Sequence, residues 1–298
     1  MFKNRPITDY LATTRPVVSV EFFPPKNEES ARQIIKTADE LKAGLKPDFV
    51  SITYGAGGGT RERTLRYARI LKNDYQFQVM PHLTCVGSTR AELVDIIKTY
   101  QDEGFCNLMA LRGDPPKGET NFVPHPDGLK YASELVHFIR EQFAGFSLGV
   151  AGYPEVHPEA ANAEIDIANL KHKCEQGASF ITTQLFFDNQ AFFKFKERCR
   201  AAGIVLPIIP GILPALSLAQ VKRFCTFCQA SVPAELERQL AEAGNDEAAG
   251  EAVGVAWAAA QIRELLAAGA PGVHLYVMNR SSSALALMRE VQPLLPNR

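Results

Sequence analysis

The sequence predicts an α/β fold, a (βα)8 barrel that forms one domain over residues 1–298. Two features predict it. Eight short runs rich in β-branched and aromatic residues alternate with segments of helical character, and strands that alternate with helices pair in parallel. The chain has 298 residues, 46% of them hydrophobic, and barrels of this kind reach that length as one domain. An open, doubly wound sheet is the alternative.

The predicted strands are short and largely apolar, as expected for strands buried on both faces. The run Asn107–Leu111 is typical, because it stops abruptly at Arg112-Gly113-Asp114 and two prolines. Catalytic groups of such barrels lie at the carboxyl ends of several strands, so a cation and a carboxylate here indicate a site. The predicted strands are Val17–Phe23, Phe49–Tyr54, Gln78–Thr84, Asn107–Leu111, Ser147–Tyr153, Phe180–Phe187, Leu206–Leu213 and Val273–Met278.

Helices are predicted between the strands, and their ends carry recognisable signals. Thr89 can cap a helix whose N3 residue is Glu92, and Gly104 suits the end of the same helix. The predicted helices are Glu28–Leu41, Arg63–Lys72, Arg90–Glu103, Leu129–Gln142, Ala160–Gln176, Gln190–Ala202 and Leu218–Phe227.

Two segments exceed what a minimal barrel needs. Ser231–Gly269 is predicted to form two helices, Pro233–Ala243 and Asp246–Ala268, and the alanine-rich second helix permits close packing. It is either an added helix or a subunit contact. Pro115–Gly128, rich in proline, glycine and charge, is the longest predicted loop and would lie over the active face.

Composition narrows the class of partner. The formal net charge of -1 argues against nucleic-acid and acidic-membrane partners, so the substrate is expected to be small. The six cysteines lack the spacing of a disulfide framework, and no signal peptide or membrane span is evident, which favours a cytoplasmic protein. Cys225 and Cys228 lack a second pair to complete a metal site, so no metal is predicted, although a minor redox or metal use stays open.

Polar residues stand at nearly every predicted strand exit. Each one alone has an ordinary structural explanation, such as a salt bridge or a hydrogen-bonded core histidine. Burying so many unpaired polar groups would cost about 1–3 kcal/mol each, so together they indicate a binding cavity. They are Glu21, Thr53, His82, Arg112-Gly113-Asp114, Tyr153, Gln184 and Asn279-Arg280.

Glu21 and Asp114 are the candidate catalytic carboxyl groups. Glu21 lies between apolar runs, and burial there would favour its protonated form, which can act as a general acid. The alternative is a carboxylate paired with a lysine of a neighbouring strand. Asp114 has Arg112 close by and is expected to stay ionised, so the two carboxyl groups would serve as an acid and a charge stabiliser.

Two further segments could contact a phosphorylated cofactor. Asp166, Asn169 and Lys173 share one face of the helix after Tyr153–Ala160, which could reach a ribose and a phosphate, or could be an ordinary solvated face. Gly55–Thr60 could form an anion-binding backbone nest, but it is neither a dinucleotide fingerprint nor a Walker A loop.

Eight motifs, in order along nearly the whole chain, resemble the methylenetetrahydrofolate reductase family of the bacterial type. The shared order of all eight motifs carries the resemblance. The motifs are Val20-Glu21-Phe22-Phe23-Pro24-Pro25, Ser51-Ile52-Thr53-Tyr54-Gly55-Ala56, Pro81-His82-Leu83-Thr84-Cys85, Leu111-Arg112-Gly113-Asp114, Tyr153–Ala160, Thr183–Asp188, Ile209–Pro214 and Asn279-Arg280.

The resemblance implies an FAD-containing barrel that reduces 5,10-methylenetetrahydrofolate to 5-methyltetrahydrofolate with NADH or NADPH. It implies that Glu21 is the general acid that opens the substrate ring to an iminium cation, and that Asp114 stabilises this cation. The implied substrate contacts are Gln184 at the pterin, Phe224 on the nicotinamide or the folate, and Gln220 and Arg280.

The resemblance also implies the residues that contact FAD. They are Thr53, His82, Arg112, Gly113, Asp114, Tyr131, Ala132, Tyr153, His157, Asp166, Asn169, His172 and Lys173. Two departures from the bacterial pattern stand out: His172 replaces an arginine, so Lys173 would neutralise more of the phosphate charge, and the Pro115–Gly128 loop is longer.

The resemblance implies a homo-oligomer. The sequence does not choose between NADH and NADPH. The rival functions are a flavin barrel that acts on another amine or imino acid, and a non-enzymatic flavin- or folate-binding regulator.

Overall fold

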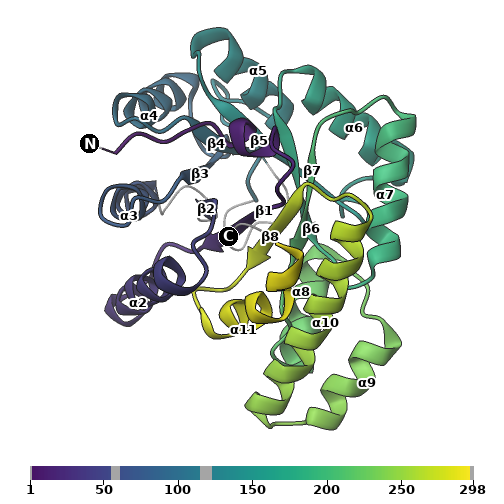
Figure 1. The fold of residues 1–298 in the computed structure, drawn as a ribbon. Helices are drawn as coiled ribbons and strands as arrows, with labels where there is room; N and C mark the ends of the chain where they lie inside the picture. The colour runs from purple at the N-terminus through teal and green to yellow at the C-terminus, as the bar shows by residue number, and fades with distance from the viewer. Residues whose placement is uncertain (1, 55–60, 115–122, 296–298) are drawn as a thin grey trace.

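Eight parallel strands close into a barrel in the order of the sequence. A computed structural model describes residues 2–54, 61–114 and 123–295 of the chain. Each strand pairs with its sequence neighbours, and β8 closes the ring on β1 (Figure 1). This confirms the predicted barrel and rules out the open sheet. The strands are β1 Val17–Phe22, β2 Phe49–Ile52, β3 Val79–Thr84, β4 Asn107–Leu111, β5 Ser147–Gly152, β6 Phe180–Leu185, β7 Ile208–Ile212 and β8 Gly272–Tyr276.

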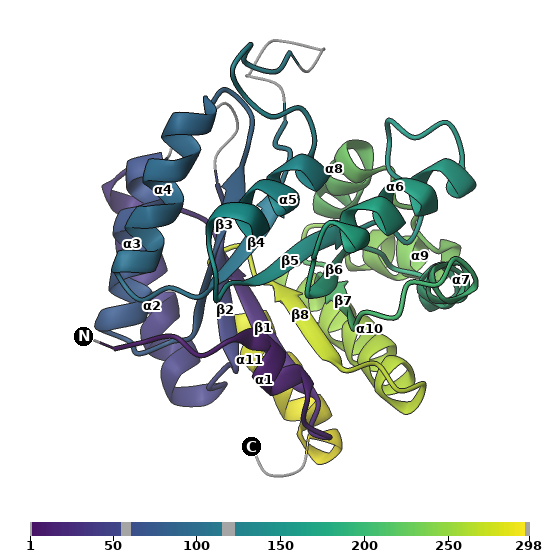
Figure 2. The same ribbon diagram turned by 90° about the horizontal axis from the view of Figure 1, so that it is seen from above.

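Helices surround the barrel, as Figures 1 and 2 show. The helices between strands are α2 Glu28–Gly44, α3 Arg61–Asn73, α4 Arg90–Asp102, α5 Ala132–Gln142, α6 Ala163–Glu175, α7 Asn189–Ala201, α8 Leu218–Cys228, α9 Ala234–Ala243 and α10 Glu247–Ala267. The terminal helices α1 Ile7–Leu11 and α11 Ser282–Val291, with the short 3-10 helix Gln292–Leu294, were not predicted from the sequence.

Local capping explains where several helices begin. Thr89 and Glu92 form the predicted capping box of α4, and Gly104 follows that helix with a φ of +78°. The segment predicted as Ala160–Gln176 begins later, at Ala163, because the side chain of Asn162 accepts the amide of Ile165 (2.9 Å) and sets the start of α6.

The barrel interior changes from apolar to polar along the strands. Alternate residues of a strand point inward, and the first inward residues form one apolar cluster that Ile7 of α1 joins. The members of this cluster include Val17, Phe49, Met80, Met109, Phe180 and Ile209. Two residues further along β1 the inward position is Ser19, and two further again it is Glu21, so the cavity above this floor is polar.

The segment Ser231–Gly269 contains the two predicted helices, α9 and α10. Together with α8 they bury a second cluster that includes Val221, Leu236 and Leu240. Helix α10 approaches the β7–α8 connection so closely that a Cβ on Gly254 would overlap the carbonyl oxygen of Ala215. The close packing expected from the small residues of this helix is therefore present, directed at the segment that leads into α8.

Some sequence predictions concern residues outside the described ranges. The predicted Gly55–Thr60 nest lies wholly outside the described residues. Residues 115–122 of the predicted Pro115–Gly128 loop also lie outside them. Within the described ranges, no helix is both long enough and apolar enough to cross a membrane.

Candidate active site

A cavity of about 600 Å³ opens at the carboxyl ends of the strands. Such a position is expected for the ligand site of a (βα)8 barrel. The cavity brings together most of the residues that the sequence singled out. These are Glu21, Thr53, His82, Arg112, Gly113, Asp114, Ala132, Tyr153, His157, Lys173 and Gln184.

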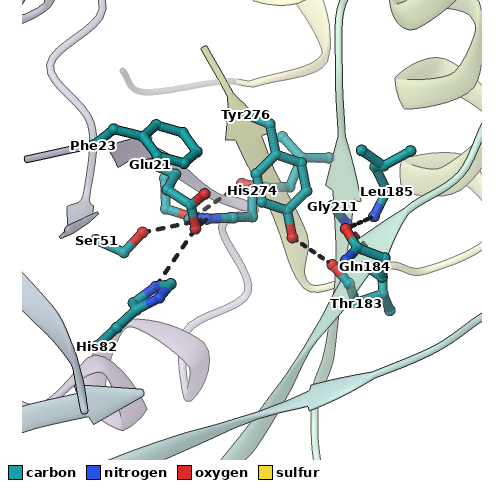
Figure 3. Close-up of polar contacts among 12 residues, drawn as sticks. Glu21, Phe23, Ser51, His82, Thr183, Gln184, Leu185, Gly211, His274 and Tyr276 are labelled. Atoms are coloured by element: carbon teal, nitrogen blue, oxygen red, sulfur yellow. Dashed lines mark hydrogen bonds and ion pairs between the residues drawn. The ribbon is translucent and has the colours of Figure 1, made fainter. Parts of the chain in front are cut away.

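Glu21 lies between two histidines. Its Oε2 atom is 3.4 Å from Nε2 of His82 and 3.7 Å from Nε2 of His274, and all three side chains are buried. Figure 3 shows the carboxyl group between the two rings, with Phe23 beside it. Nε2 of His82 makes no hydrogen bond within the described residues, so its approach to Glu21 is a close contact without a formed hydrogen bond. The carboxyl group therefore has two imidazole neighbours within 4 Å.

This geometry corrects the environment expected for Glu21. The apolar residues next to it in sequence, Val20 and Phe22, face the helices and belong to the outer core. Successive side chains of a strand point to opposite faces, so sequence neighbours do not surround the carboxyl group. The alternative of a lysine partner is wrong as well, because the partners are histidines of β3 and β8.

His274 is held from below by two serines. Its Nδ1 atom lies 2.7 Å from the hydroxyl oxygen of Ser19, and its Nε2 atom lies 3.5 Å from that of Ser51. Its ring also stacks on Phe49, with ring centroids 6.2 Å apart. These contacts come from β1 and β2, so three adjacent strands fix the imidazole next to Glu21.

Tyr276 reaches from β8 across β7 to β6. Its hydroxyl donates to the carbonyl oxygen of Thr183 (2.7 Å), and burial raises its pKa well above the usual value for tyrosine. Gly211 makes this position possible, since a Cβ there would lie 2.6 Å from the tyrosine ring. The neighbouring Gln184 turns its Oε1 atom to the amide of Leu185 (2.9 Å), as Figure 3 shows. The phenol of Tyr276, on the strand next to Glu21, and the amide of Gln184 therefore border the site.

The Arg112-Gly113-Asp114 segment differs from the expected arrangement. Arg112 forms two hydrogen bonds with Glu159, of 2.5 and 2.6 Å. Glu159 raises the pKa of Arg112 more than the charge of Asp114 does. Glu159 follows the next strand, so its proximity could not be inferred from sequence spacing. Asp114 is exposed at the cavity mouth. Gly113 has a φ of +91°, which a side chain would strain, and a Cβ there would lie 3.0 Å from Thr84.

The segment after β5 is held in a strained conformation. Val156 has a φ of +79°, which is rare for a β-branched residue. The amide of His157 donates to Asp166 (3.2 Å), whose pKa is raised mainly because the carboxyl group is buried. Lys173 donates to the carbonyl oxygen of Ala151 (2.7 Å), and burial lowers the pKa of its ammonium group. Helix α6 thus supports this wall of the cavity through Asp166 and Lys173, whereas Asn169, which was predicted on the same face, is exposed.

Several predicted contacts do not line the cavity. Tyr131 stands just before α5, makes no capping bond through its side chain and is half exposed. Asn169 is exposed on α6, and Asp166 accepts the amide of His157 from behind the cavity wall. His172 lines a separate, smaller pocket with Arg90 and His137.

The remaining predicted substrate contacts also lie outside the cavity lining. Oε1 of Gln220 accepts the amide of Leu216 (2.8 Å), and Phe224 packs on the cluster of α8–α10. Arg280 is exposed.

The sequence reasoning missed His274, Tyr276 and Thr183. A signal for the first two was present, because His274 and Tyr276 alternate along β8 in the way that Ser19 and Glu21 alternate along β1. The register pairs Ser19 with His274 and Glu21 with Tyr276. Thr183 contributes to the site through its backbone carbonyl, for which no sequence signal exists.

The buried imidazole of His82 predicts a pH dependence of stability. Burial lowers its pKa, although the charge of Glu21 opposes this effect. An unfolded chain takes up the proton at about pH 6.5, whereas the folded chain resists it, so the free energy of unfolding falls as the pH drops below that value. We expect His82→Asn to flatten this decline, by up to about 1.4 kcal/mol per pH unit, the limit for one proton.

Urea unfolding between about pH 5 and 7.5 measures this slope, since that interval brackets the histidine titration. The matched control is His137→Gln, which removes a histidine whose side chain is 54% exposed on α5. Equal slopes for His82→Asn and the unchanged chain would contradict the assignment.

The donor set of the cavity suits an organic ligand. The hydroxyl oxygens of Thr84 and Thr182 are buried in its wall without a hydrogen-bond partner among the described residues. Across those same residues, no group of three or more histidine, cysteine or acidic side chains is arranged to hold a metal ion. All six cysteines are free, and Cys225 and Cys228 lie in α8.

Fold and cavity define a (βα)8-barrel protein with a buried carboxyl group between two histidines at the carboxyl ends of its strands. Residues 6–292 match the family model described as methylenetetrahydrofolate reductase, and the chain belongs to this family. It is 38% identical over 270 residues to the 5,10-methylenetetrahydrofolate reductases of Escherichia coli and Salmonella typhimurium, covering 91% of this chain and 88% of each relative.

A longer relative comes from a plant. A probable methylenetetrahydrofolate reductase (NADH) of Oryza sativa is 37% identical over 292 residues, which is 95% of this chain. The chain spans 49% of that relative, about half its length.

Solved structures support the fold alone. A Clostridium thermocellum protein, described as uncharacterized and as binding two copies of 5-methyl-5,6,7,8-tetrahydrofolic acid, has a TM-score of 0.64 at 17% identity and covers 96% of this chain and 99% of its own. Oxaloacetate acetylhydrolase has a TM-score of 0.54 at 10% identity, covering 100% of this chain and 88% of its own.

Proposed function

We propose that this chain reduces 5,10-methylenetetrahydrofolate to 5-methyltetrahydrofolate, with FAD as its cofactor and NADH or NADPH as the electron donor. The observation that carries the proposal is the buried carboxyl group of Glu21, which two imidazoles flank at the cavity floor. The bacterial relatives of matching length carry this activity in their names. The chain would act in the cytoplasm, as a homo-oligomer.

The cavity residues fit a flavin nucleotide. Unpaired threonine hydroxyls can bond a polar ring edge, and the lining includes the cationic side chains of Lys173 and Arg112, of which Arg112 is already paired with Glu159. The residues that would hold the cofactor are Thr53, His82, Arg112, Gly113, Asp114, Ala132, Tyr153, His157 and Lys173, with Asp166 behind them. When bound, FAD supplies the hydride that reduces the substrate carbon.

Glu21 would act first, as the general acid. Opening the five-membered ring of the folate leaves an amine nitrogen that needs a proton, and a buried glutamic acid can deliver it. His82 and His274 lie within 4 Å of the same Oε2 atom, so they can orient the carboxyl group and return a proton to it. Burial keeps His82 neutral by lowering its pKa, which allows it to exchange a proton without adding a fixed positive charge.

Asp114 would act on the cation that ring opening creates. A carboxylate near an iminium group stabilises the charge where it develops. Asp114 is exposed, so water screens its charge until ligands fill the cavity mouth. Its contribution is therefore expected only when folate is bound.

We expect Asp114→Asn to slow the folate half-reaction about a hundredfold and to slow flavin reduction by NADH or NADPH much less. The substitution removes the negative charge and keeps the size of the side chain. Stopped-flow absorbance measures the two half-reactions separately. Asp127→Asn is the control, since it alters an exposed carboxylate outside the cavity lining. Equal slowing of both half-reactions would count against the electrostatic role.

The visible absorption spectrum of the purified protein tests the function as a whole. Flavin bands that bleach anaerobically with NADH or NADPH and return with methylenetetrahydrofolate would support both half-reactions and identify the donor. Reoxidation by another amine or imino acid in place of folate would favour the rival barrel oxidoreductase. A folded, FAD-supplemented preparation that binds no flavin would overturn the proposal.

A further inference from the structure

The turn after β8 contains two consecutive left-handed residues that are not glycine. Met278 has a φ of +50° and Asn279 a φ of +55°. A left-handed residue of this kind costs about 1–2 kcal/mol, and asparagine tolerates it better than most. Such strain persists where surrounding contacts determine the conformation, and it concentrates near functional sites.

The side chain of Asn279 holds this turn to the end of β1. Its Oδ1 atom accepts the amide of Phe23 (2.9 Å), and its Nδ2 atom donates to the carbonyl oxygen of the same residue (2.8 Å). The backbone register between β1 and β8 ends at Glu21 and Tyr276. The amide group of Asn279 therefore continues the pairing of the two strands beyond the last backbone pair.

A second anchor holds the main chain of the same turn. The carbonyl oxygen of Asn279 accepts the hydroxyl of Thr37 (2.7 Å) and the side-chain amide of Gln33 (3.1 Å), both from α2. These bonds fix the turn but do not involve the Asn279 side chain. They provide a natural control for the contact with Phe23.

Phe23, the residue that the Asn279 side chain holds, is part of the site. Phe23 lines the cavity next to Glu21, as Figure 3 shows, and follows it by two positions in the chain. The carboxyl group must keep its place between His82 and His274, whose strands are fixed in the barrel. The main chain of Glu21 is itself paired with Ser51 of β2 and Tyr276 of β8, so loss of the Asn279 tether would release Phe23 and, through it, the side chain of Glu21 rather than the strand.

We infer that Asn279 is a positioning residue for Glu21, acting through the backbone of Phe23. It does not touch the reacting atoms. Its role in catalysis rests on the proposed function, whereas its role in placing the carboxyl group can be measured without any substrate.

Two substitutions separate the side-chain bonds from the strained backbone. Asn279→Gly accepts the left-handed conformation and lacks the amide, and Asn279→Asp keeps the shape but loses the donor to Phe23. Both are expected to slow the folate half-reaction at saturating folate about tenfold to a hundredfold, as small misplacements of catalytic groups do. KM for folate and flavin reduction by NADH or NADPH should change less than about twofold, because neither reports a transition state that needs the acid.

Thr37→Val is the matched control, because it removes an anchor of the same turn and leaves the Asn279 side chain intact. It should lower the melting temperature without changing the folate half-reaction. Equal slowing in Thr37→Val and Asn279→Gly would overturn the inference, because general loosening of the turn would then explain the loss.

NMR titration of His82 supplies the measurement that needs no turnover. The charge of Glu21 raises the pKa of this imidazole. Displacement of Glu21 in Asn279→Gly should lower the His82 pKa, as removal of the charge in Glu21→Gln is also expected to do. A His82 titration identical to that of the unchanged chain would overturn the inference. If folate fails to reoxidise the unchanged enzyme, the proposed function fails, and the titration still decides the positioning role.

Discussion

For the proposed function, Glu21→Gln is expected to slow folate reduction at least a hundredfold while flavin binding and flavin reduction by NADH or NADPH persist. Glutamine keeps the size and the hydrogen-bonding ability of the side chain but cannot donate the proton that ring opening requires. General acids typically contribute about 10²–10⁴-fold in rate, so the folate half-reaction should slow by at least a hundredfold. Anaerobic stopped-flow absorbance, with the flavin reduced before folate is added, measures this step alone.

The control for this experiment is Glu29→Gln, which neutralises an exposed carboxylate in the first turn of α2. Its two half-reactions should match those of the unchanged chain. Normal folate turnover in Glu21→Gln would remove Glu21 from the acid role. Loss of flavin binding in the variant would instead mean that the carboxyl group supports the architecture of the cavity.

Gly254→Ala is expected to produce the largest loss of stability. A Cβ at this position would overlap the carbonyl oxygen of Ala215 and lie 2.7 Å from its amide nitrogen. Both atoms are backbone, so relief requires α10 to move away from the β7–α8 connection. Overpacking typically lowers the free energy of unfolding by about 1–3 kcal/mol. Because the overlap here is with backbone atoms, we expect a loss at the upper end, about 3 kcal/mol.

Urea unfolding of Gly254→Ala, compared with Ala256→Ser, measures this loss. Ala256 is exposed on the same helix, so its substitution should cost only about 0.5 kcal/mol through helix propensity. Similar unfolding of both variants would show that α10 and the connection do not meet closely in solution. Because this connection leads into α8, Gly254→Ala should also disturb the placement of Gln220 and Phe224.

Much of the barrel could be predicted because its signals are local. The strand Asn107–Leu111 was predicted to the residue, since an apolar run ends at a glycine and two prolines. The Thr89 capping box depends on residues three apart and was also found. Helix α1 was missed because its five residues are too few to show a period. Helix α11 was missed although a signal was present, since its buried residues, such as Ala284, Leu287 and Val291, recur at helical spacing.

The sequence predicted many of the residues that line the candidate site, but fewer of the contacts between them. Strand exits indicated Glu21, His82 and Gln184, and all three line the cavity. Spacing along the chain could not show that Arg112 binds Glu159, because that pair joins two different loops. The predicted roles of Gln220, Phe224, Arg280 and the FAD contacts stay predictions, and His172 lies in another pocket.

The sequence by itself determined the eight-unit alternation, the family to which the chain belongs, and the identity of the candidate acid. Each depends on residue types and their order, which the chain carries directly. Only the tertiary structure decided what surrounds Glu21. Barrel closure brings β8 beside β1, so His274 and Asn279, more than 250 residues away along the chain, become neighbours of the first strand. Contacts between distant strands depend on register and closure, and no local pattern encodes them.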